Sequence, residues 1–201
     1  MRLPVLRVCH HGVLGGRDGD VLVCASIGPT GEMVAVWAKP EGLAAVTSAI
    51  VSAAGACFPD PAAARPVAAR ITVHTPDLAA VTPIADLALS HITVQPMPCG
   101  QFLVAGARCR RRHDGPDRNG VLYDADGQVV AEGVLRDGIG HVLATSDGQV
   151  WVGYLDEGIY GWGQPGADEP IGASGIVRFS SDWSLSGTTQ VHRDRQVGCD
   201  Q

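Results

Sequence analysis

Three segments of the chain share one pattern, and this repeat limits the folds that the sequence can adopt. Residues 31–36, 100–104 and 148–153 each begin with a glycine and a polar residue and continue with aliphatic or aromatic residues. Gly100 and Gly148 are 48 residues apart. Gly31 and Gly100 are 69 residues apart, which implies an insertion of about 20 residues in the first copy. Short strands repeated at such a period are typical of the blades of a β-propeller.

Each copy of the repeat predicts four short strands in a meander. Runs rich in Val, Ile and Leu, bounded by Gly, Asp or Pro, follow one another along the chain. The expected fold class is therefore all-β: a β-propeller-like arc of about three four-stranded antiparallel blades. A single domain is expected over residues 1–201, with blades at about 19–90, 91–137 and 138–190 and a tail at 191–201.

Composition fits a turn-rich β protein. The 201 residues include 26 glycines and 13 prolines, and the net charge is −6. This acidic balance argues against nucleic acid as a partner, and no apolar run is long enough for a membrane-spanning helix. The first residues lack the apolar core of a secretory signal, so a cytoplasmic location is expected. The six cysteines form no CxxC pair, which favours free thiols and gives no support for a zinc site.

The connections between the second and third strands of each copy are predicted to be long. They cover about residues 40–69, 109–119 and 156–174. Insertions in a repeat protein gather on one face, which is often the binding face. These three connections are therefore expected to leave the sheets on the same side.

The first connection has two interpretations. Leu43, Val46, Ile50 and Val51 are spaced as on one stripe of a short helix within residues 41–58. An irregular apolar loop is the alternative, and the sequence does not decide between the two.

The third copy of the repeat resembles a known family. Residues 147–153 carry a turn Asp-Gly, a polar residue, an aliphatic residue, Trp, another aliphatic residue and Gly. This pattern is similar to the blade repeat of the sensor β-propellers of two-component regulators. The whole chain also resembles uncharacterised actinobacterial proteins, which carry blocks similar to residues 106–119 and 152–158. Both resemblances imply a propeller-like fold, and neither implies an activity.

Aromatic and acidic residues gather where the third connection begins. Aromatic rings supply stacking faces, and carboxylates bind hydroxyl groups or cations, so this cluster suits a small polar ligand. In the structural alternative, the carboxylates cap the end of a strand and the aromatic side chains pack the connection down. The candidate ligand-binding residues are Tyr154, Asp156, Glu157, Tyr160 and Trp162.

The second connection is rich in arginine. Arg110 and His113 are further candidate ligand-binding residues, because cationic side chains bind phosphate or carboxylate groups. The alternative is that Asp114 and Asp117 pair with the arginines and order the connection without a ligand. If neighbouring blades place this connection beside the third one, the two form a cleft with both charges.

Three functional classes follow from these patterns. The first is a non-catalytic propeller module that binds a small polar ligand or a protein partner through its long connections, without a metal or other cofactor. The second is a metal-dependent propeller enzyme of the lactonase or lyase type, which would hold a divalent cation such as calcium through Asp156, Glu157, Asn119 and His141. The third is a structural scaffold. Catalytic residues cannot be named from the sequence.

Three blades do not close a ring, since closed propellers have four to eight. A homodimer or missing blades would complete the ring, or residues 1–18 would add a strand to a partial blade. Apolar sheet faces left open at the ends of the arc would favour self-association.

Overall fold

The computed structural model describes residues 19–75, 77–113, 115–160, 171–180 and 185–188, and antiparallel strands dominate this part of the chain. Three four-stranded sheets each run as a meander in chain order. Sheet 1 consists of β1 (Val21–Ile27), β2 (Met33–Ala38), β5 (Ala62–His74) and β6 (Leu78–Leu89). Sheet 2 consists of β7 (Ile92–Met97), β8 (Gln101–Gly106), β11 (Gly120–Tyr123) and β12 (Val129–Gly133). Sheet 3 consists of β13 (Ile139–Ala144), β14 (Val150–Tyr154), β15 (Ile176–Phe179) and β16 (Leu185–Thr188).

The all-β prediction is therefore confirmed. The finer prediction, that the sheets are blades of a propeller, stays a prediction. The repeated glycines lie in the turn before the second strand of each sheet. Gly31, Gly100 and Gly148 have φ values of 89°, 71° and 83°, a conformation that other residues adopt only with strain. The repeat in the sequence is thus a repeat of turn geometry.

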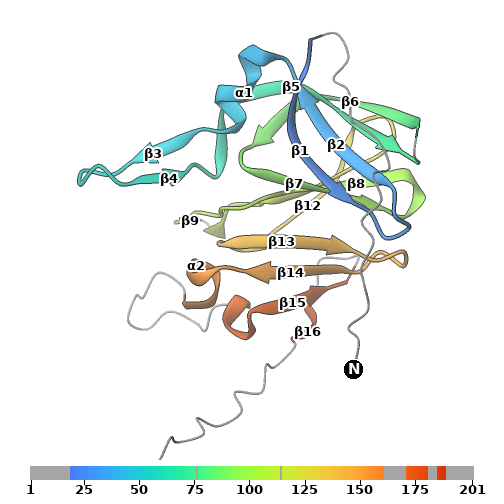
Figure 1. The fold of residues 1–201 in the computed structure, drawn as a ribbon. Helices are drawn as coiled ribbons and strands as arrows, with labels where there is room; N and C mark the ends of the chain where they lie inside the picture. Colours follow the sequence, from blue (N-terminus) through green and yellow to red (C-terminus); the bar gives the residue numbers. More distant parts are fainter. Residues whose placement is uncertain (1–18, 76, 114, 161–170, 181–184, 189–201) are drawn as a thin grey trace, which may run out of the picture.

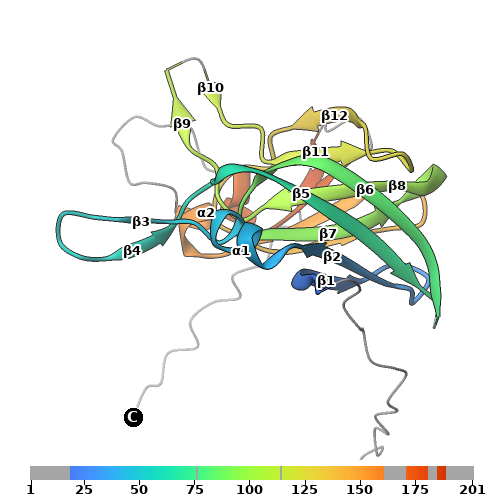
Figure 2. The same ribbon diagram turned by 90° about the horizontal axis from the view of Figure 1, so that it is seen from above.

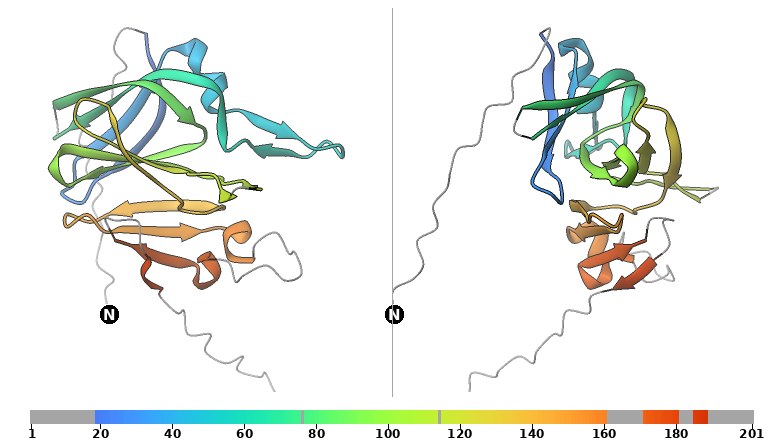
Figure 3. Two further views of the ribbon diagram at one scale, coloured as in Figure 1. Left: turned by 180° about the vertical axis from the view of Figure 1, so that it is seen from behind. Right: turned by 90° about the vertical axis from the view of Figure 1, so that its right-hand side faces the viewer.

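Sheet 2 lies between the other two sheets (Figures 1 and 3). Alternate residues of its strand β8 point to opposite faces, as the pleat of a strand requires. Phe102 and Val104 contribute to the apolar core shared with sheet 1, and Leu103 and Ala105 contribute to the core shared with sheet 3. Both faces of sheet 2 are therefore covered.

The first long connection differs from both sequence interpretations. A short helix, α1 (Pro40–Val46), is followed by a two-stranded hairpin of β3 (Ala49–Val51) and β4 (Cys57–Pro59). Leu43 and Val46 lie on the helix, as the helical stripe predicted, whereas Ile50 and Val51 lie on β3. A few apolar residues at such short range fit both helical and strand spacing, so the pattern could not separate them.

The first connection is also shorter than the range of residues 40–69 that we expected. Strand β5 begins at Ala62, so residues 62–69 belong to sheet 1. The pairing of β5 with β6 shifts register between Ala62 and Val67 and again between Val67 and Ala69. Pro66 lies in this irregular stretch, which accommodates a residue without a backbone N–H.

The other two connections carry smaller elements. β9 (Arg111–Arg112) and β10 (Gly115–Pro116) form a short hairpin between β8 and β11. Helix α2 (Asp156–Tyr160) and the 3₁₀ turn η2 (Ile171–Ser174) lie between β14 and β15, and a second 3₁₀ turn, η1 (Pro98–Gly100), joins β7 to β8. None of the helices in the described residues is long and apolar enough to cross a membrane.

Because β8 contributes to both cores, truncating its side chains is expected to lower the free energy of unfolding more than truncating an exposed leucine does. Leu103 is 0% exposed, so Leu103→Ala should lower the free energy of unfolding by about 2–5 kcal/mol. Leu155 is 55% exposed, so the control Leu155→Ala should change it by no more than about 0.5 kcal/mol. Urea unfolding followed by tryptophan fluorescence measures both changes. Equal costs for the two variants would contradict the central position of sheet 2.

Candidate functional site

The three long connections project from the same side of the sheets (Figures 1 and 2). We call this side the insertion face and define it by the hairpin β3–β4, the hairpin β9–β10 and helix α2. The expectation that the insertions gather on one side is thus met in the described part of the chain. The described candidate ligand-binding residues lie on these elements or at their bases, whereas the candidate cation ligand His141 lies on β13.

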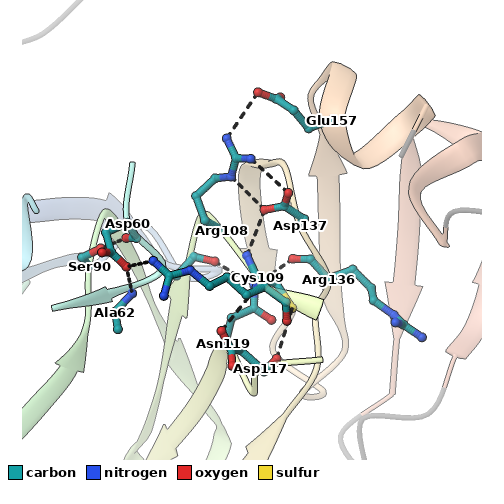
Figure 4. A network of polar contacts seen from close by, with 12 residues as sticks. Asp60, Ala62, Ser90, Arg108, Cys109, Asp117, Asn119, Arg136, Asp137 and Glu157 are labelled. Carbon is teal, nitrogen blue, oxygen red and sulfur yellow. Dashed lines mark hydrogen bonds and ion pairs between the residues drawn. The ribbon is translucent and has the colours of Figure 1, made fainter. Parts of the chain in front are cut away.

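An ion-pair cluster around Arg108 connects the second and third connections (Figure 4). The Arg108 guanidinium donates from Nε and Nη2 to the two carboxylate oxygens of Asp137, at 2.8 and 3.1 Å. Its third nitrogen, Nη1, lies 3.3 Å from Oε1 of Glu157 on α2. The Asp137 carboxylate also accepts the backbone N–H of Cys109 at 2.9 Å. This bidentate pair is nearly buried, and it fixes the end of β8 against the β12–β13 connection.

The Asn119 side chain also holds neighbouring backbone segments together. Its amide nitrogen donates to the backbone carbonyls of Gly106 at 2.9 Å and of Arg136 at 2.8 Å. Its side-chain oxygen accepts the backbone N–H of Leu135 at 2.9 Å. Arg136 has a φ of 69°, which is unusual for a residue other than glycine, and the contact with Asn119 holds this conformation. The Asn119 side chain is 1% exposed and its polar atoms are engaged in these bonds.

Two glycines allow helix α2 to pack closely against the β12–β13 connection. A Cβ atom on Gly138, which has a φ of 73°, would lie 2.3 Å from the backbone nitrogen of Gly158. A Cβ atom on Gly158 would lie 2.6 Å from the carbonyl oxygen of Asp137. Any larger residue at either position would push α2, and Glu157 with it, away from Arg108.

Ion pairs hold the second connection, one within the connection and one with the first connection. Asp114, which the structural alternative also named as a partner, lies outside the described residues. Arg110 Nη2 lies 2.9 Å from Oδ1 of Asp60, which ties this connection to the base of the β3–β4 hairpin. Arg112 pairs with Asp117 in the same connection. His113 is exposed at the end of β9. Between these elements is a hollow of about 170 Å³ lined by Pro61, Ala62, Leu89, Arg108, Arg112, Asp117, Arg118 and Asn119.

The candidate residues of the third connection have different environments. Tyr154 is buried, and its hydroxyl donates to the carbonyl of Leu135 at 2.6 Å. Burial also raises the pKa of the Tyr154 hydroxyl. Asp156 and Tyr160 are exposed at the two ends of α2, and Trp162 lies outside the described residues. Whether any of these residues binds a ligand stays a prediction.

The four residues proposed as ligands of a divalent cation are not brought together. Asn119 is held by backbone groups and Glu157 by Arg108, whereas His141 is exposed on β13, opposite Gly153. Within the residues that the structure describes, no group of three or more His, Cys, Asp or Glu side chains could hold a metal ion.

The candidate binding residues chosen from the sequence did not include the exposed apolar residues of the first connection. Ile50, Val51 and Phe58 are all exposed on the β3–β4 hairpin. The signal was present in the sequence, because residues 47–58 contain no charged side chain in a segment that we expected to lie on the surface. Contiguous apolar patches on the surface of many proteins are interaction sites.

The Arg108 cluster gives a prediction for stability. Asp137→Ala should lower the free energy of unfolding by about 3–5 kcal/mol, because it leaves a nearly buried guanidinium without its main partner. Arg118 and Glu132 form an exposed pair 3.5 Å apart, so Glu132→Ala should cost less than about 1 kcal/mol. Thermal unfolding of both variants measures the difference. A small cost for Asp137→Ala would show that the cluster does not hold the two connections together.

The four cysteines that the structure describes carry free thiols in two environments. Burial, with the nearby charges of Asp117 and Asp137, raises the pKa of the Cys109 thiol to about 11, and burial raises that of Cys24 to about 12. Cys57 and Cys99 are exposed. At pH 8, iodoacetamide should therefore modify Cys57 and Cys99, while Cys24 and Cys109 react only after denaturation. Peptide mass spectrometry reads out each site, and rapid modification of Cys109 in the folded protein would contradict its protected position.

Comparisons with known proteins add no family to this description. No family model matches the chain, and no curated protein matches it. One similar solved structure is that of a protein of unknown function from Bacteroides caccae, with 9% sequence identity and a TM-score of 0.24. The match covers 85% of this chain and 81% of that chain. At this TM-score the likeness carries no argument about fold or function.

Proposed function

We propose that this chain is a non-catalytic interaction module that binds an extended segment of a protein partner by strand addition to β3. The observation that carries the proposal is the β3–β4 hairpin, a two-stranded sheet that projects from the insertion face (Figure 1). Proteins and peptides commonly bind by adding a strand to such an edge, where main-chain hydrogen bonds supply affinity and alternate side chains supply specificity.

The register of the hairpin identifies the backbone groups that are free to pair. Ser52 N–H donates to the carbonyl of Ala56 at 2.8 Å, and Asp60 N–H donates to the carbonyl of Ser48 at 2.9 Å. Hydrogen-bonded and non-hydrogen-bonded pairs alternate along an antiparallel ladder. Ile50 and Phe58 lie two positions from each of these bonded pairs, so they form the next hydrogen-bonded pair. The N–H and C=O groups of Val51 therefore point away from β4.

The two edges of the hairpin differ in chemistry. The β4 edge ends in Pro59, which has no N–H to donate to an added strand. The β3 edge has neither a proline nor a charged residue, and Val51 is 68% exposed. Natural proteins protect exposed edge strands with charges, prolines or covering elements. The unprotected edge of β3, with its β-branched residues, is therefore typical of a surface that a partner covers.

The side chains around this edge indicate the chemistry of the partner. Ile50 and Phe58 lie opposite each other and are both exposed, so they favour an apolar side chain in the added strand. Arg111 is exposed on the β9–β10 hairpin of the same face and favours an acidic residue beside the strand. The proposed partner segment is an extended, apolar stretch flanked by acidic residues.

A small polar ligand in the arginine-lined hollow is less well supported. Small-molecule sites usually measure about 300–1,000 Å³, and this hollow measures about 170 Å³. Its cationic side chains are also already paired, since Arg108 contacts Asp137, Arg112 contacts Asp117 and Arg118 contacts Glu132. A ligand would have to displace these carboxylates.

A single substitution tests the strand addition. Val51→Pro removes an outward N–H and leaves the hydrogen bonds between β3 and β4 intact, because Val51 makes none of them. Peptides selected on the folded protein from a random phage-displayed library should carry apolar and acidic residues, and Val51→Pro should weaken their binding by about tenfold or more. Fluorescence polarisation with the synthetic peptides measures the affinity.

Two matched variants complete this experiment. Val51→Thr keeps the outward N–H and should retain most of the affinity, and Cys57→Pro blocks the other edge and should also retain it. Circular dichroism of each variant verifies that the fold is kept. Equal binding by wild type and Val51→Pro, or loss of binding in Cys57→Pro alone, would overturn the proposed role of β3.

A further inference from the structure

The outward backbone groups of β3 belong to two residues, and their spacing suits pairing of the strand with a copy of itself. Ala49 and Val51 lie opposite Pro59 and Cys57, between the hydrogen-bonded pairs of the hairpin, so their own N–H and C=O groups point away from β4. In an antiparallel pair of two β3 strands centred on Ile50, Ala49 of each strand lies opposite Val51 of the other. Each of these pairs can exchange two backbone hydrogen bonds. This register uses the outward groups of both residues in both strands.

In this register, apolar side chains meet across the two-fold axis on one face of the four strands. Ile50 lies opposite its own copy in a non-hydrogen-bonded pair, in which side chains approach more closely than in a hydrogen-bonded pair. Phe58 lies opposite Ile50 within each hairpin, so a Phe58 ring flanks each Ile50. Ile50 is 40% exposed and Phe58 is 45% exposed. Pairing therefore brings exposed apolar side chains of both hairpins into one row.

The other face of the same four strands is also uncharged. Val51 of each copy lies beside Ala49 of the other, with Cys57 and Pro59 on the outer strands. Residues 47–58 contain no charged side chain, so pairing this segment with itself brings no like charges together. The β3 edge thus lacks the charges that prevent edge-to-edge pairing in many proteins.

The β4 edges limit the assembly to two copies. In a sheet with the order β4–β3–β3–β4, both outer strands are β4. Pro59 lies opposite Ala49 in a non-hydrogen-bonded pair, so the N–H that it lacks is one that would face a further strand. A two-fold pair also uses each β3 edge once and is closed. These features favour a dimer and oppose a growing fibre.

We propose that two copies of this chain pair through their β3 strands, and that this pair masks the β3 edge until a partner segment displaces one copy. The masking rests on the proposed function of β3, whereas the pairing itself does not. The contact involves only a few residues of each copy, so the pair is weaker than a protein interface of standard size. A weak pair suits an edge that a partner must also reach.

Charge favours the partner segment over the second copy. Arg111 is exposed on the insertion face, and residues 47–58 offer it no acidic side chain. The proposed partner segment carries acidic residues, so it adds an attraction to Arg111 to the same backbone hydrogen bonds. The second copy therefore occupies the edge with the lower affinity of the two.

A cysteine on the two-fold axis tests the pairing. The two Cα atoms of a non-hydrogen-bonded pair lie about 4.5 Å apart, which is within the range that a disulfide spans. Ile50→Cys should therefore form a disulfide-linked dimer in oxidised glutathione, as read out by non-reducing electrophoresis. The background carries serine at the four cysteines that are exposed or outside the described residues, Cys9, Cys57, Cys99 and Cys199.

Val51→Cys in the same background is the matched control. Position 51 lies opposite position 49 of the other copy, so two cysteines at position 51 are offset along the strands and should cross-link about tenfold more slowly. Val51 is 68% exposed and Ile50 is 40% exposed, so cross-linking by random collision would give the opposite order. Equal rates for the two variants, or a faster rate for Val51→Cys, would overturn the proposed pair.

Light scattering of the protein without added cysteines gives a second measurement. From micromolar to millimolar protein, the mass should rise from that of one chain to that of two and no further. Val51→Pro should keep the mass of one chain, because it removes an outward N–H, and Cys57→Pro should still pair. A wild-type mass that stays at one chain would overturn the pair, and a mass that grows beyond two chains would overturn its closure.

Competition separates this proposal from the proposed function. Peptides selected on the folded protein should slow the cross-linking of Ile50→Cys at concentrations that saturate this variant, because both occupants need the N–H of Val51. Peptide binding that leaves the cross-linking rate unchanged would overturn the masking. Cross-linking of Ile50→Cys without any peptide that binds at β3 would support the pair and overturn the proposed function instead.

Discussion

The alternation of side chains along β8 is the constraint on which the rest of the structure depends. A strand that is apolar on both faces cannot rest at the surface, so sheet 2 must be covered twice. Phe102 and Val104 meet sheet 1, and Leu103 and Ala105 meet sheet 3. The order of the three sheets follows from this single strand.

Polar contacts hold the connections between strands that lie outside the apolar cores. Arg108 joins the end of β8 to the β12–β13 connection and to α2, and Asn119 holds the strained backbone of Arg136 nearby. These groups are nearly buried and bonded to one another, which makes them costly to rearrange. They hold the bases of the β9–β10 hairpin and of α2, and the Arg110–Asp60 ion pair joins the second connection to the base of the β3–β4 hairpin. A rigid base limits the ordering entropy that binding would cost.

The strands and turns could be predicted from the sequence because their signals are local: a turn glycine, a polar residue and an alternating apolar run. The environments of the site residues could not, because their partners lie far along the chain. Tyr154 resembles a ligand-binding tyrosine in the sequence, yet its hydroxyl contacts the carbonyl of Leu135 in the core. Asp60 lies 50 residues from Arg110, its partner. The hairpin at Ile50 was missed because a short apolar run has no unique period.

The doubly covered sheet has a consequence for vectorial synthesis. As the chain leaves the ribosome, sheet 1 is complete before sheet 2 begins, so Phe102 and Val104 find a surface to cover them at once. Leu103 and Ala105 do not, because sheet 3 is finished only at β16. At about 5–20 residues per second, this face waits several seconds for its cover. One face of the layer that is covered on both sides in the folded protein is thus exposed during synthesis, and a chaperone is suited to protect that face.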